Sequence, residues 1–149
     1  MKLSLEILTK DKIVLEDYVE TWEQAIQQAS KPLIDQKIIE NDYVNSMIES
    51  VHEFGPYIVI APEIAIAHAR PDNNVNEVGL SLLKLDDHIN FSNDGHYASL
   101  IFVLSAVDSN SHLGILQSLA QLLGNKENVE KLLDSKSKED IINIIKEND

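Results

Sequence analysis

The chain has 149 residues, of which 44% are hydrophobic and 25% are charged, a balance typical of one globular domain spanning residues 1–149. The absence of cysteine excludes a disulfide framework, a thiolate metal site and a cysteine nucleophile. A formal net charge of −13 disfavours nucleic acid and anionic lipid as partners, because both carry phosphate charge, and favours a basic face on a partner protein.

No targeting or membrane segment is predicted. The stretch from Met1 to Asp11 lacks the apolar core of a signal peptide. No apolar run approaches the roughly 20 residues that a membrane-spanning helix needs. The sequence therefore predicts a cytoplasmic protein.

Two helices are predicted in the first third of the chain. Thr21 and Gln24 have the spacing of a capping box, so a helix begins there. A second helix runs from about Asn41 through Val51. Gly55-Pro56 ends it, because glycine suits a left-handed cap and proline cannot continue the hydrogen-bond ladder.

Three strands are predicted in the middle of the chain. Tyr57–Ala61 is a short, apolar, β-branched run. Alternation of apolar with polar or small residues at Val78, Leu80 and Leu82 predicts a half-buried strand. Ala98–Val107 is nearly all apolar, which is typical of a central strand buried on both faces.

Three further helices are predicted after these strands. The run Asp108-Ser109-Asn110-Ser111 consists of N-cap residues, so a helix starts near Ser111 and ends at Gly124-Asn125. Asn128–Leu133 and Lys138–Lys146 form two short terminal helices. The alternation of helices and strands predicts a single-domain α/β fold with a mixed β-sheet flanked by helices, and it leaves the strand order open.

His68 is the first candidate functional residue. It lies two residues before Arg70, the only arginine in the chain, and residues 72–74 predict a turn after it. A guanidinium presents a planar fork that can bind phosphate through two hydrogen bonds. The pair therefore indicates an anion site; the alternative is a histidine at a strand end beside a surface arginine.

His112 is the second candidate. It falls in the first turn of the helix predicted to start near Ser111, on the face that carries Leu116 and Leu119, so it points toward the sheet. A helix N-terminus offers free N–H groups and a positive dipole end, which favour a phosphate. The alternative is a capping or packed core histidine.

The other three histidines are weaker candidates for functional residues. His52 is read as a surface residue. His88 follows two aspartates and His96 follows Asp94-Gly95, and both are expected in one polar loop. These clusters lack the spacing of known helical metal motifs, so a metal or small-ligand site there is a minor alternative.

Phosphoryl transfer is the chemistry that His68, Arg70 and His112 suit together. A neutral imidazole is nucleophilic near neutral pH, because its pKa is about 6.5. Transfer of a phosphoryl group then needs mostly positioning and charge stabilisation. These three residues and a helix N-terminus could supply both without a metal or cofactor.

The segment from Gly55 to Pro71 resembles the active-site segment of enzyme IIA components of the sugar phosphotransferase system, in the mannitol/fructose family and most closely its ascorbate-type branch. The run Asn110-Ser111-His112-Leu113, followed by Ser118-Leu119, resembles the helix that carries the second active-site histidine of that family. The order of helices and strands also matches, so the resemblance covers nearly the whole chain.

The resemblance implies a phosphotransferase with a phosphohistidine intermediate. His68 would accept phosphate from the phosphocarrier HPr and pass it to a cysteine of enzyme IIB, serving the membrane enzyme IIC indirectly during uptake of an ascorbate-like sugar or a sugar alcohol. His112 would hold the phosphoryl group or fix the ring of His68. A homodimer is left open. The alternative is a regulatory phosphoacceptor module of the same fold.

Three positions depart from the family pattern. Ala67 stands where the family usually has proline, which is expected to loosen the backbone before His68. Glu63 stands where the ascorbate branch has glycine, and its carboxylate is expected to repel a nearby phosphate. Ser50 stands near an arginine of mannitol-type members, whose work Arg70 would then do.

Overall fold

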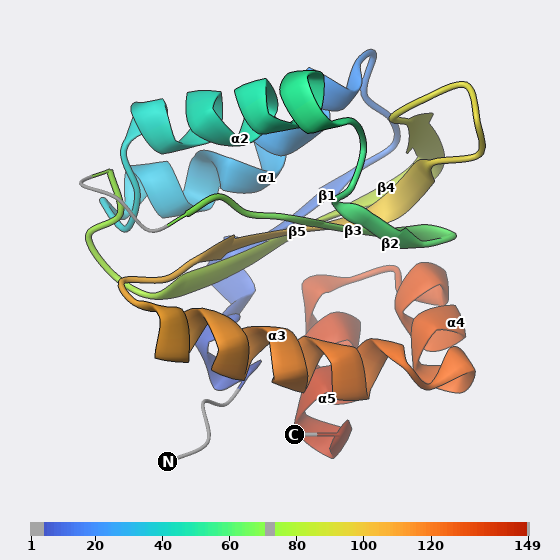
Figure 1. Cartoon of the computed structure of the whole chain (residues 1–149). Helices are drawn as coiled ribbons and strands as arrows, with labels where there is room; N and C mark the ends of the chain where they lie inside the picture. The colour runs from blue at the N-terminus through green and yellow to red at the C-terminus, as the bar shows by residue number, and fades with distance from the viewer. Residues whose placement is uncertain (1–4, 71–73, 149) are drawn as a thin grey trace.

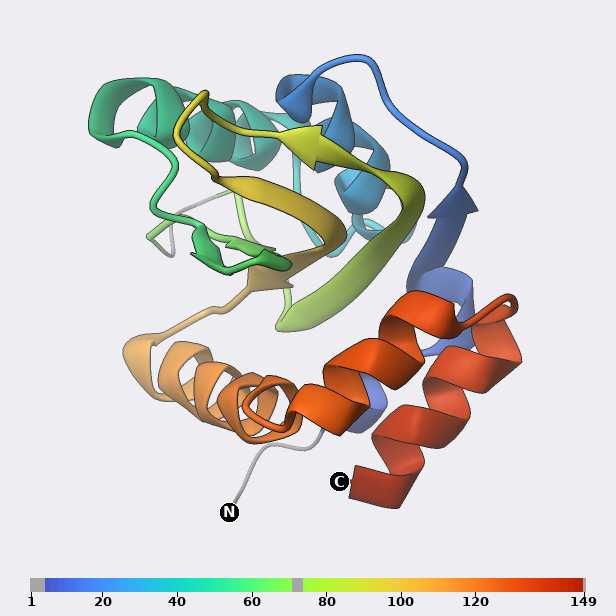
Figure 2. The ribbon, with the colours of Figure 1, turned by 90° about the vertical axis from the view of Figure 1, so that its right-hand side faces the viewer.

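The computed structural model describes residues 5–70 and 74–148, and it has a β-sheet between two layers of helices (Figure 1). Two helices cover one face: α1, Trp22–Asp35, and α2, Asn41–Phe54. Three cover the other: α3, Ser109–Leu123; α4, Lys126–Asp134; and α5, Lys138–Asn148. Figure 2 shows the same layers from the side, with the three C-terminal helices together below the sheet. The predicted single-domain α/β fold is confirmed.

The sheet has five strands in the order β1-β4-β5-β3-β2. Their bounds are β1, Ile13–Glu16; β2, Val59–Ala61; β3, Glu63–Ala67; β4, Gly79–Asn90; and β5, Tyr97–Ser105. β1 runs parallel to β4 and β3 runs parallel to β5, whereas the β4–β5 and β2–β3 pairs are antiparallel. The sheet is therefore mixed, as predicted, and the apolar run that was expected to be central forms its middle strand.

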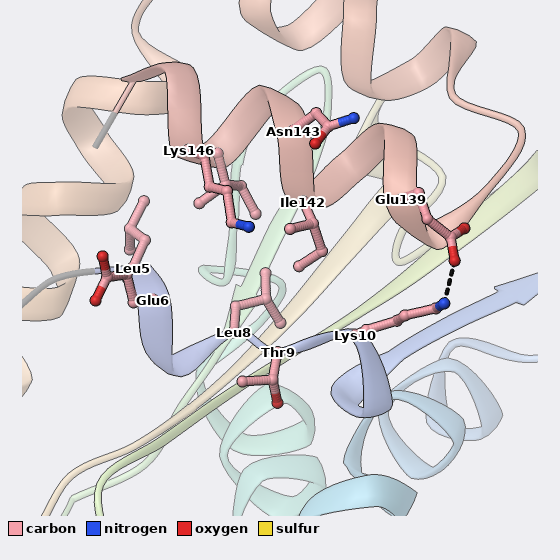
Figure 3. Close-up of a pocket in the computed structure, with 10 residues that line it drawn as sticks. Leu5, Glu6, Leu8, Thr9, Lys10, Glu139, Ile142, Asn143 and Lys146 are labelled. Atoms are coloured by element: carbon pink, nitrogen blue, oxygen red, sulfur yellow. Dashed lines mark ion pairs between the residues drawn. The ribbon is translucent and has the colours of Figure 1, made fainter.

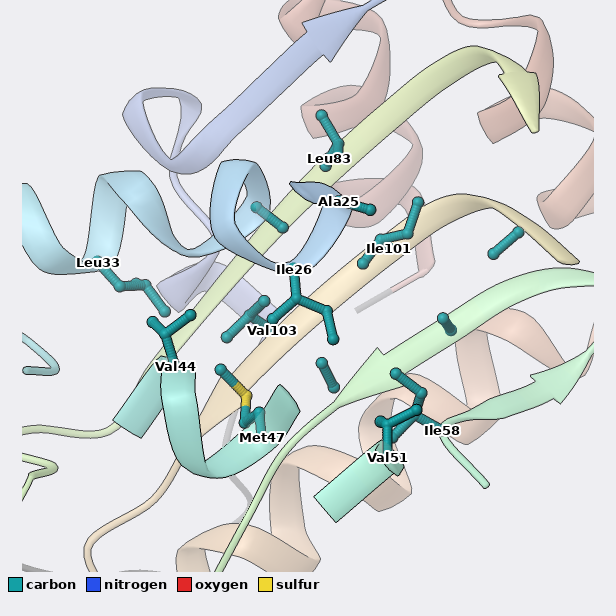
Figure 4. Close-up of a cluster of buried hydrophobic side chains, with 14 of the residues drawn as sticks. Ala25, Ile26, Leu33, Val44, Met47, Val51, Ile58, Leu83, Ile101 and Val103 are labelled. Atoms are coloured by element: carbon teal, nitrogen blue, oxygen red, sulfur yellow. The ribbon is translucent and has the colours of Figure 1, made fainter. Parts of the chain in front are cut away.

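A separate hydrophobic cluster fills the space on each face of the sheet. Ile101 and Val103 of β5 pack toward α1 and α2, in the cluster drawn in Figure 4. Leu100 and Phe102 pack toward α3, α4 and α5. Because successive side chains of a strand alternate between faces, a strand covered on both sides must be apolar at every position. β5 meets this requirement except at Ser99 and Ser105: every residue after Tyr97 is buried, and these two hydroxyls donate hydrogen bonds to the Glu63 carboxylate and the Glu77 carbonyl.

The predicted ends of the first two helices are confirmed. The Thr21 side chain accepts a hydrogen bond from the Gln24 N–H at 3.1 Å, and the Gln24 side chain accepts one from the Glu20 N–H at 2.8 Å. α2 ends at Gly55, whose φ of +89° favours a residue without Cβ. The second end matters for function, because it brings the chain to the segment that carries His68.

β4 differs from its prediction as a half-buried strand. It is longer, and its first seven residues are all buried. The polar residues that suggested an exposed face are accommodated inside: Ser81 donates to the Ala29 carbonyl at 2.6 Å, and the buried Lys84 pairs with Asp86 at 3.5 Å. The alternation therefore reflects satisfied polar groups rather than a solvent face.

Other boundaries also differ. β1 and β3 are strands that the pattern did not separate from loops, and α3 begins at Ser109, two residues before the expected start. His88 lies in β4 rather than in a loop. In the expected turn at 72–74, Asn74 is in a turn, and residues 72 and 73 lie outside the described part of the chain.

None of the helices within residues 5–70 and 74–148 is both long enough and apolar enough to span a lipid bilayer.

Candidate functional site

His68 and His112 lie side by side at one end of the sheet. His68 is the first residue after β3, and His112 is in the first turns of α3, which follows β5. Because β3 and β5 are parallel neighbours, their carboxyl ends meet at the same edge. The two imidazole rings have centroids 5.0 Å apart and an interplanar angle of 68°. Two histidines 44 positions apart in the chain thus share one site.

The hydrogen bond of His68 assigns the position of its ring proton. Nδ1 lies 2.9 Å from the carbonyl oxygen of Ile66. A carbonyl oxygen can only accept, so Nδ1 carries the hydrogen in this contact. Nε2 then holds the free lone pair of the neutral ring. The ring edge also packs against Tyr57, with centroids 5.9 Å apart at 90°.

The environment of His112 favours its uncharged form. Partial burial lowers its pKa below the ordinary value of 6.5, and the nearby charge of protonated His68 lowers it further. At neutral pH the ring is therefore neutral, with one N–H to donate and one lone pair to accept. Such a ring can donate a hydrogen bond to a phosphoryl oxygen without first binding a proton.

The two histidines line a cleft of about 380 Å³. Its walls come from the C-terminal part of α2, the segment before β2, the segment after β3 and the start of α3; the lining residues are Ser50, Phe54, Tyr57, His68, Ala69, Arg70, Ser109 and His112. Arg70 is exposed and lies beyond the end of β3, so it reaches the same cleft as His68. Ser50, which stands near the arginine position of mannitol-type members, also lines the cleft.

The N-terminus of α3 is less open than predicted. The Asp108 carboxylate accepts the Ser111 N–H at 2.7 Å, and this bond lowers the pKa of Asp108 below its usual range. A negative charge already caps the helix there, so a phosphate would gain less from the free N–H groups than the sequence indicated. The guanidinium of Arg70 is consequently the main positive group at the cleft.

The prediction that the Glu63 carboxylate would repel a phosphate on His68 is wrong. Glu63 is the first residue of β3 and His68 follows the last, so about 16 Å of strand separates them at 3.3 Å per residue. The Glu63 carboxylate accepts the Ser99 hydroxyl at 2.7 Å and lies 3.9 Å from Nδ1 of His88. Its φ of +75° explains why a glycine suits this position.

The remaining histidines lie away from this cleft. His52 is a surface residue, as predicted, 3.3 Å from a carboxylate oxygen of Glu23. Nδ1 of His96 lies 2.7 Å from the Ser92 hydroxyl. Across residues 5–70 and 74–148, no three His, Cys, Asp or Glu side chains are grouped so as to hold a metal ion.

A larger cleft, of about 550 Å³, lies between the N-terminal segment and α5 (Figure 3). Apolar side chains such as Leu8 and Ile142 form much of its wall, and an ion pair joins Lys10 to Glu139 beside it. Its lining contains no histidine and no arginine. It thus lacks the groups that phosphoryl transfer would use, and the smaller cleft is the better candidate.

Two tyrosines at the site were missed in the sequence. The Tyr57 hydroxyl donates to the His68 carbonyl at 3.3 Å, and the Tyr43 hydroxyl accepts the Ala69 N–H at 3.1 Å. They hold the backbone that the Ala67 substitution was expected to loosen. In the sequence Tyr43 is one more apolar position of a helix, and no pattern marks its hydroxyl.

The chain is similar to proteins of one family over nearly its whole length. Residues 6–148 match the family "Phosphoenolpyruvate-dependent sugar phosphotransferase system, EIIA 2". The "Ascorbate-specific PTS system EIIA component" of Escherichia coli (strain K12) is 30% identical over 148 residues, covering 97% of this chain and 96% of that protein.

Solved structures agree with this similarity. The solution structure of the mannitol-specific cryptic phosphotransferase enzyme IIA from Escherichia coli has a TM-score of 0.88 and 30% identity, covering 95% of this chain and 97% of that one. A complex of mannitol enzyme IIA with phosphorylated enzyme IIB from Escherichia coli has a TM-score of 0.82 at 21% identity, covering 94% and 97%. The second likeness is one of fold.

Proposed function

Since this chain belongs to the EIIA 2 family of the phosphoenolpyruvate-dependent sugar phosphotransferase system, we propose that it carries a phosphoryl group on His68 between two partner proteins. The donor is HPr, and the acceptor is a cysteine of an enzyme IIB component. The chain acts in the cytoplasm as a single enzyme IIA domain over residues 1–149. The observation that carries the proposal is the pairing of His68 with His112, 5.0 Å apart, in a cleft beside the only arginine.

Acceptance of the phosphoryl group uses Nε2 of His68. Its lone pair attacks the phosphorus of the donor phosphohistidine, an N–P bond forms, and the electron pair of the breaking bond returns to the donor ring. Nδ1 keeps its hydrogen bond to the Ile66 carbonyl, so the phosphorylated ring is held in place. The ring becomes cationic while it carries the phosphoryl group, which makes it a good leaving group.

Transfer to enzyme IIB reverses this step at a different nucleophile. A cysteine thiolate attacks the phosphorus, an S–P bond forms, and the N–P electron pair returns to Nε2. His68 then leaves as a neutral imidazole with its Nδ1 hydrogen still in place. The absence of cysteine from this chain is consistent with an acceptor on another chain.

The proposal is tested by mixing the protein with phosphoenolpyruvate, enzyme I and HPr, and measuring its intact mass. One phosphate should be added, and adding a cognate enzyme IIB should remove it. Protein that stays unmodified under conditions that phosphorylate another enzyme IIA would contradict the proposed function.

The sugar is proposed from the relatives, whose names specify ascorbate and mannitol. We expect an ascorbate-like acid or a sugar alcohol to be transported through the membrane enzyme IIC. Uptake of labelled ascorbate and labelled mannitol by cells that lack this chain tests the choice. Loss of neither activity would exclude both substrates.

Exposed apolar side chains around the cleft support docking of a protein. Phe54 is 70% exposed and Tyr57 43% exposed, and both line the cleft. Val107 and Leu113, also exposed, flank the start of α3 that carries His112. Exposed apolar groups that gather in one place commonly mark a protein interface. A partner with apolar groups at its centre and basic groups around them would fit this acidic chain.

Replacing Phe54 with alanine should weaken docking without changing the chemical step. Truncating an aromatic residue at the centre of an interface costs about 1–2 kcal/mol or more, so KM for HPr or enzyme IIB should rise roughly 5- to 30-fold. Tyr18→Ala is the matched control, because Tyr18 is also strongly exposed, at 61%, but follows β1, at the opposite end of the sheet. Equal KM values for both variants would exclude Phe54 from the interface.

Replacing His112 with alanine should slow transfer to enzyme IIB more than acceptance from HPr. In acceptance the nucleophile is the ring of His68, which the Ile66 carbonyl already orients. In transfer the departing phosphoryl group relies on neighbouring donors, and losing one hydrogen bond to a charged group should slow this step about 10- to 150-fold. Rapid-quench kinetics of the two half-reactions measure this difference. Wild-type rates in both would leave His112 as a packing residue.

A further inference from the structure

Tyr43 places a buried hydroxyl between the two segments that carry the histidines. It comes from α2, and only 1% of the residue is exposed. The hydroxyl accepts the N–H of Ala69, the residue after His68, at 3.1 Å and donates to the carbonyl of Leu104 in β5 at 2.8 Å. A buried hydroxyl is costly unless it is hydrogen-bonded, so both bonds hold it in one position.

The register of β3 and β5 shows what this hydroxyl replaces. The last pairs are Ile66 with Phe102 and Ala67 with Val103, so a continued ladder would put Ala69 opposite Ser105. In a parallel ladder the N–H of Ala69 would then donate to the carbonyl of Leu104. The two groups that would form this next bond are therefore the two that the Tyr43 hydroxyl joins.

The direction of the backbone groups agrees with this geometry. The N–H of Ile66 donates to the Ile58 carbonyl at 2.9 Å, on the β2 side of β3. Because N–H groups alternate along a strand, those of Ala67 and Ala69 point to the other side, toward β5. The Tyr43 hydroxyl is thus inserted into the β3–β5 ladder as an extra link, two residues beyond the last direct pair, Ala67 with Val103.

We infer that Tyr43 is a positioning residue for phosphoryl transfer, which sets the separation between the segment of His68 and the end of β5 that leads to His112. This inference rests on the proposed function. A direct bond between Ala69 and Leu104 would draw the strand ends together, whereas the inserted hydroxyl keeps them apart by one oxygen atom. Ala69, whose N–H the hydroxyl accepts, lines the same cleft as His68 and His112, so this link holds one wall of the cleft.

The test compares Tyr43→Phe with Ser81→Ala, a matched control. Each variant loses one buried hydroxyl, and Ser81 donates to the Ala29 carbonyl away from the cleft. We expect the kcat for transfer to enzyme IIB to fall on the order of 10-fold or more in Tyr43→Phe, because small displacements of reacting groups have effects of this size. The KM for enzyme IIB should be unchanged, since the exposed docking residues remain. Ser81→Ala should keep the wild-type kcat.

Nuclear magnetic resonance of the unphosphorylated proteins gives a second measure that does not require activity. In Tyr43→Phe the ring signals of His68 and His112 and the amide of Ala69 should shift, and in Ser81→Ala they should not. Wild-type rates or unchanged ring signals in folded Tyr43→Phe would overturn the inference, as would an equal loss of kcat in Ser81→Ala. Wild-type protein that accepts no phosphate would instead contradict the proposed function, and the ring signals would still decide the role of Tyr43.

Discussion

Replacing His68 with alanine is expected to abolish phosphate incorporation from HPr. Nε2 of His68 is the nucleophile of the proposed reaction, and alanine leaves no group in its place. His112 lies beside it, but within residues 5–70 and 74–148 its imidazole makes no hydrogen bond to a backbone carbonyl like the one that orients His68. We therefore expect the phosphorylated fraction, measured by intact mass after the reaction, to fall from nearly complete to none.

The matched control for this prediction is His52→Ala, which removes a surface histidine on α2 and should leave phosphorylation complete. Circular dichroism of both variants verifies that the fold is retained. A full phosphate adduct on folded His68→Ala would show that another histidine is the acceptor. His112 would then be the first alternative, because it shares the same cleft.

Local patterns predicted the elements whose ends are set by nearby residues. The cap at Thr21, the glycine at position 55 and the continuous apolar run of β5 each depend on a few neighbouring positions, and all three are confirmed. β1 was missed because it has only four residues, and its partner in β4 lies about 70 positions away. A strand this short is stabilised by its pairing and packing, which no local pattern records.

The residues of the candidate site fall into the same two groups: those that a local pattern indicates, and those whose surroundings are set by distant elements. His68 and Arg70 are close in the sequence, so their spacing was enough to propose them together, and His112 was proposed from its place at the start of a helix; all three line one cleft. Glu63 was misjudged because five residues of an extended strand carry it to the far end of the sheet. The sequence could not indicate Tyr43, since its inferred role depends on the carbonyl of Leu104 and the N–H of Ala69, which other elements bring to its hydroxyl.

Arg70→Ala is expected to slow phosphoryl transfer about 10- to 150-fold. A hydrogen bond to a charged group contributes roughly 1.5–3 kcal/mol, and about 1.4 kcal/mol corresponds to a tenfold change in rate. Arg70 is the main positive group at the cleft, because Asp108 already caps the start of α3. Arg70→Lys should recover part of the rate, since lysine keeps the charge but loses the planar fork.

A compensating arginine at a second position gives a further test of the role of Arg70. Ser50 lines the cleft with Arg70, so an arginine at position 50 can reach the same phosphoryl group from α2. Ser50→Arg should therefore restore part of the rate to Arg70→Ala, whereas Ser46→Arg, one turn earlier on an exposed part of α2, should not. Single-turnover phosphoryl transfer is measured for wild type, for Arg70→Ala and Arg70→Lys, and for the two double variants, with folding verified by circular dichroism. Folded Arg70→Ala that transfers as fast as wild type would show that Arg70 takes no part in the reaction, and its charge would then be available only for docking a partner.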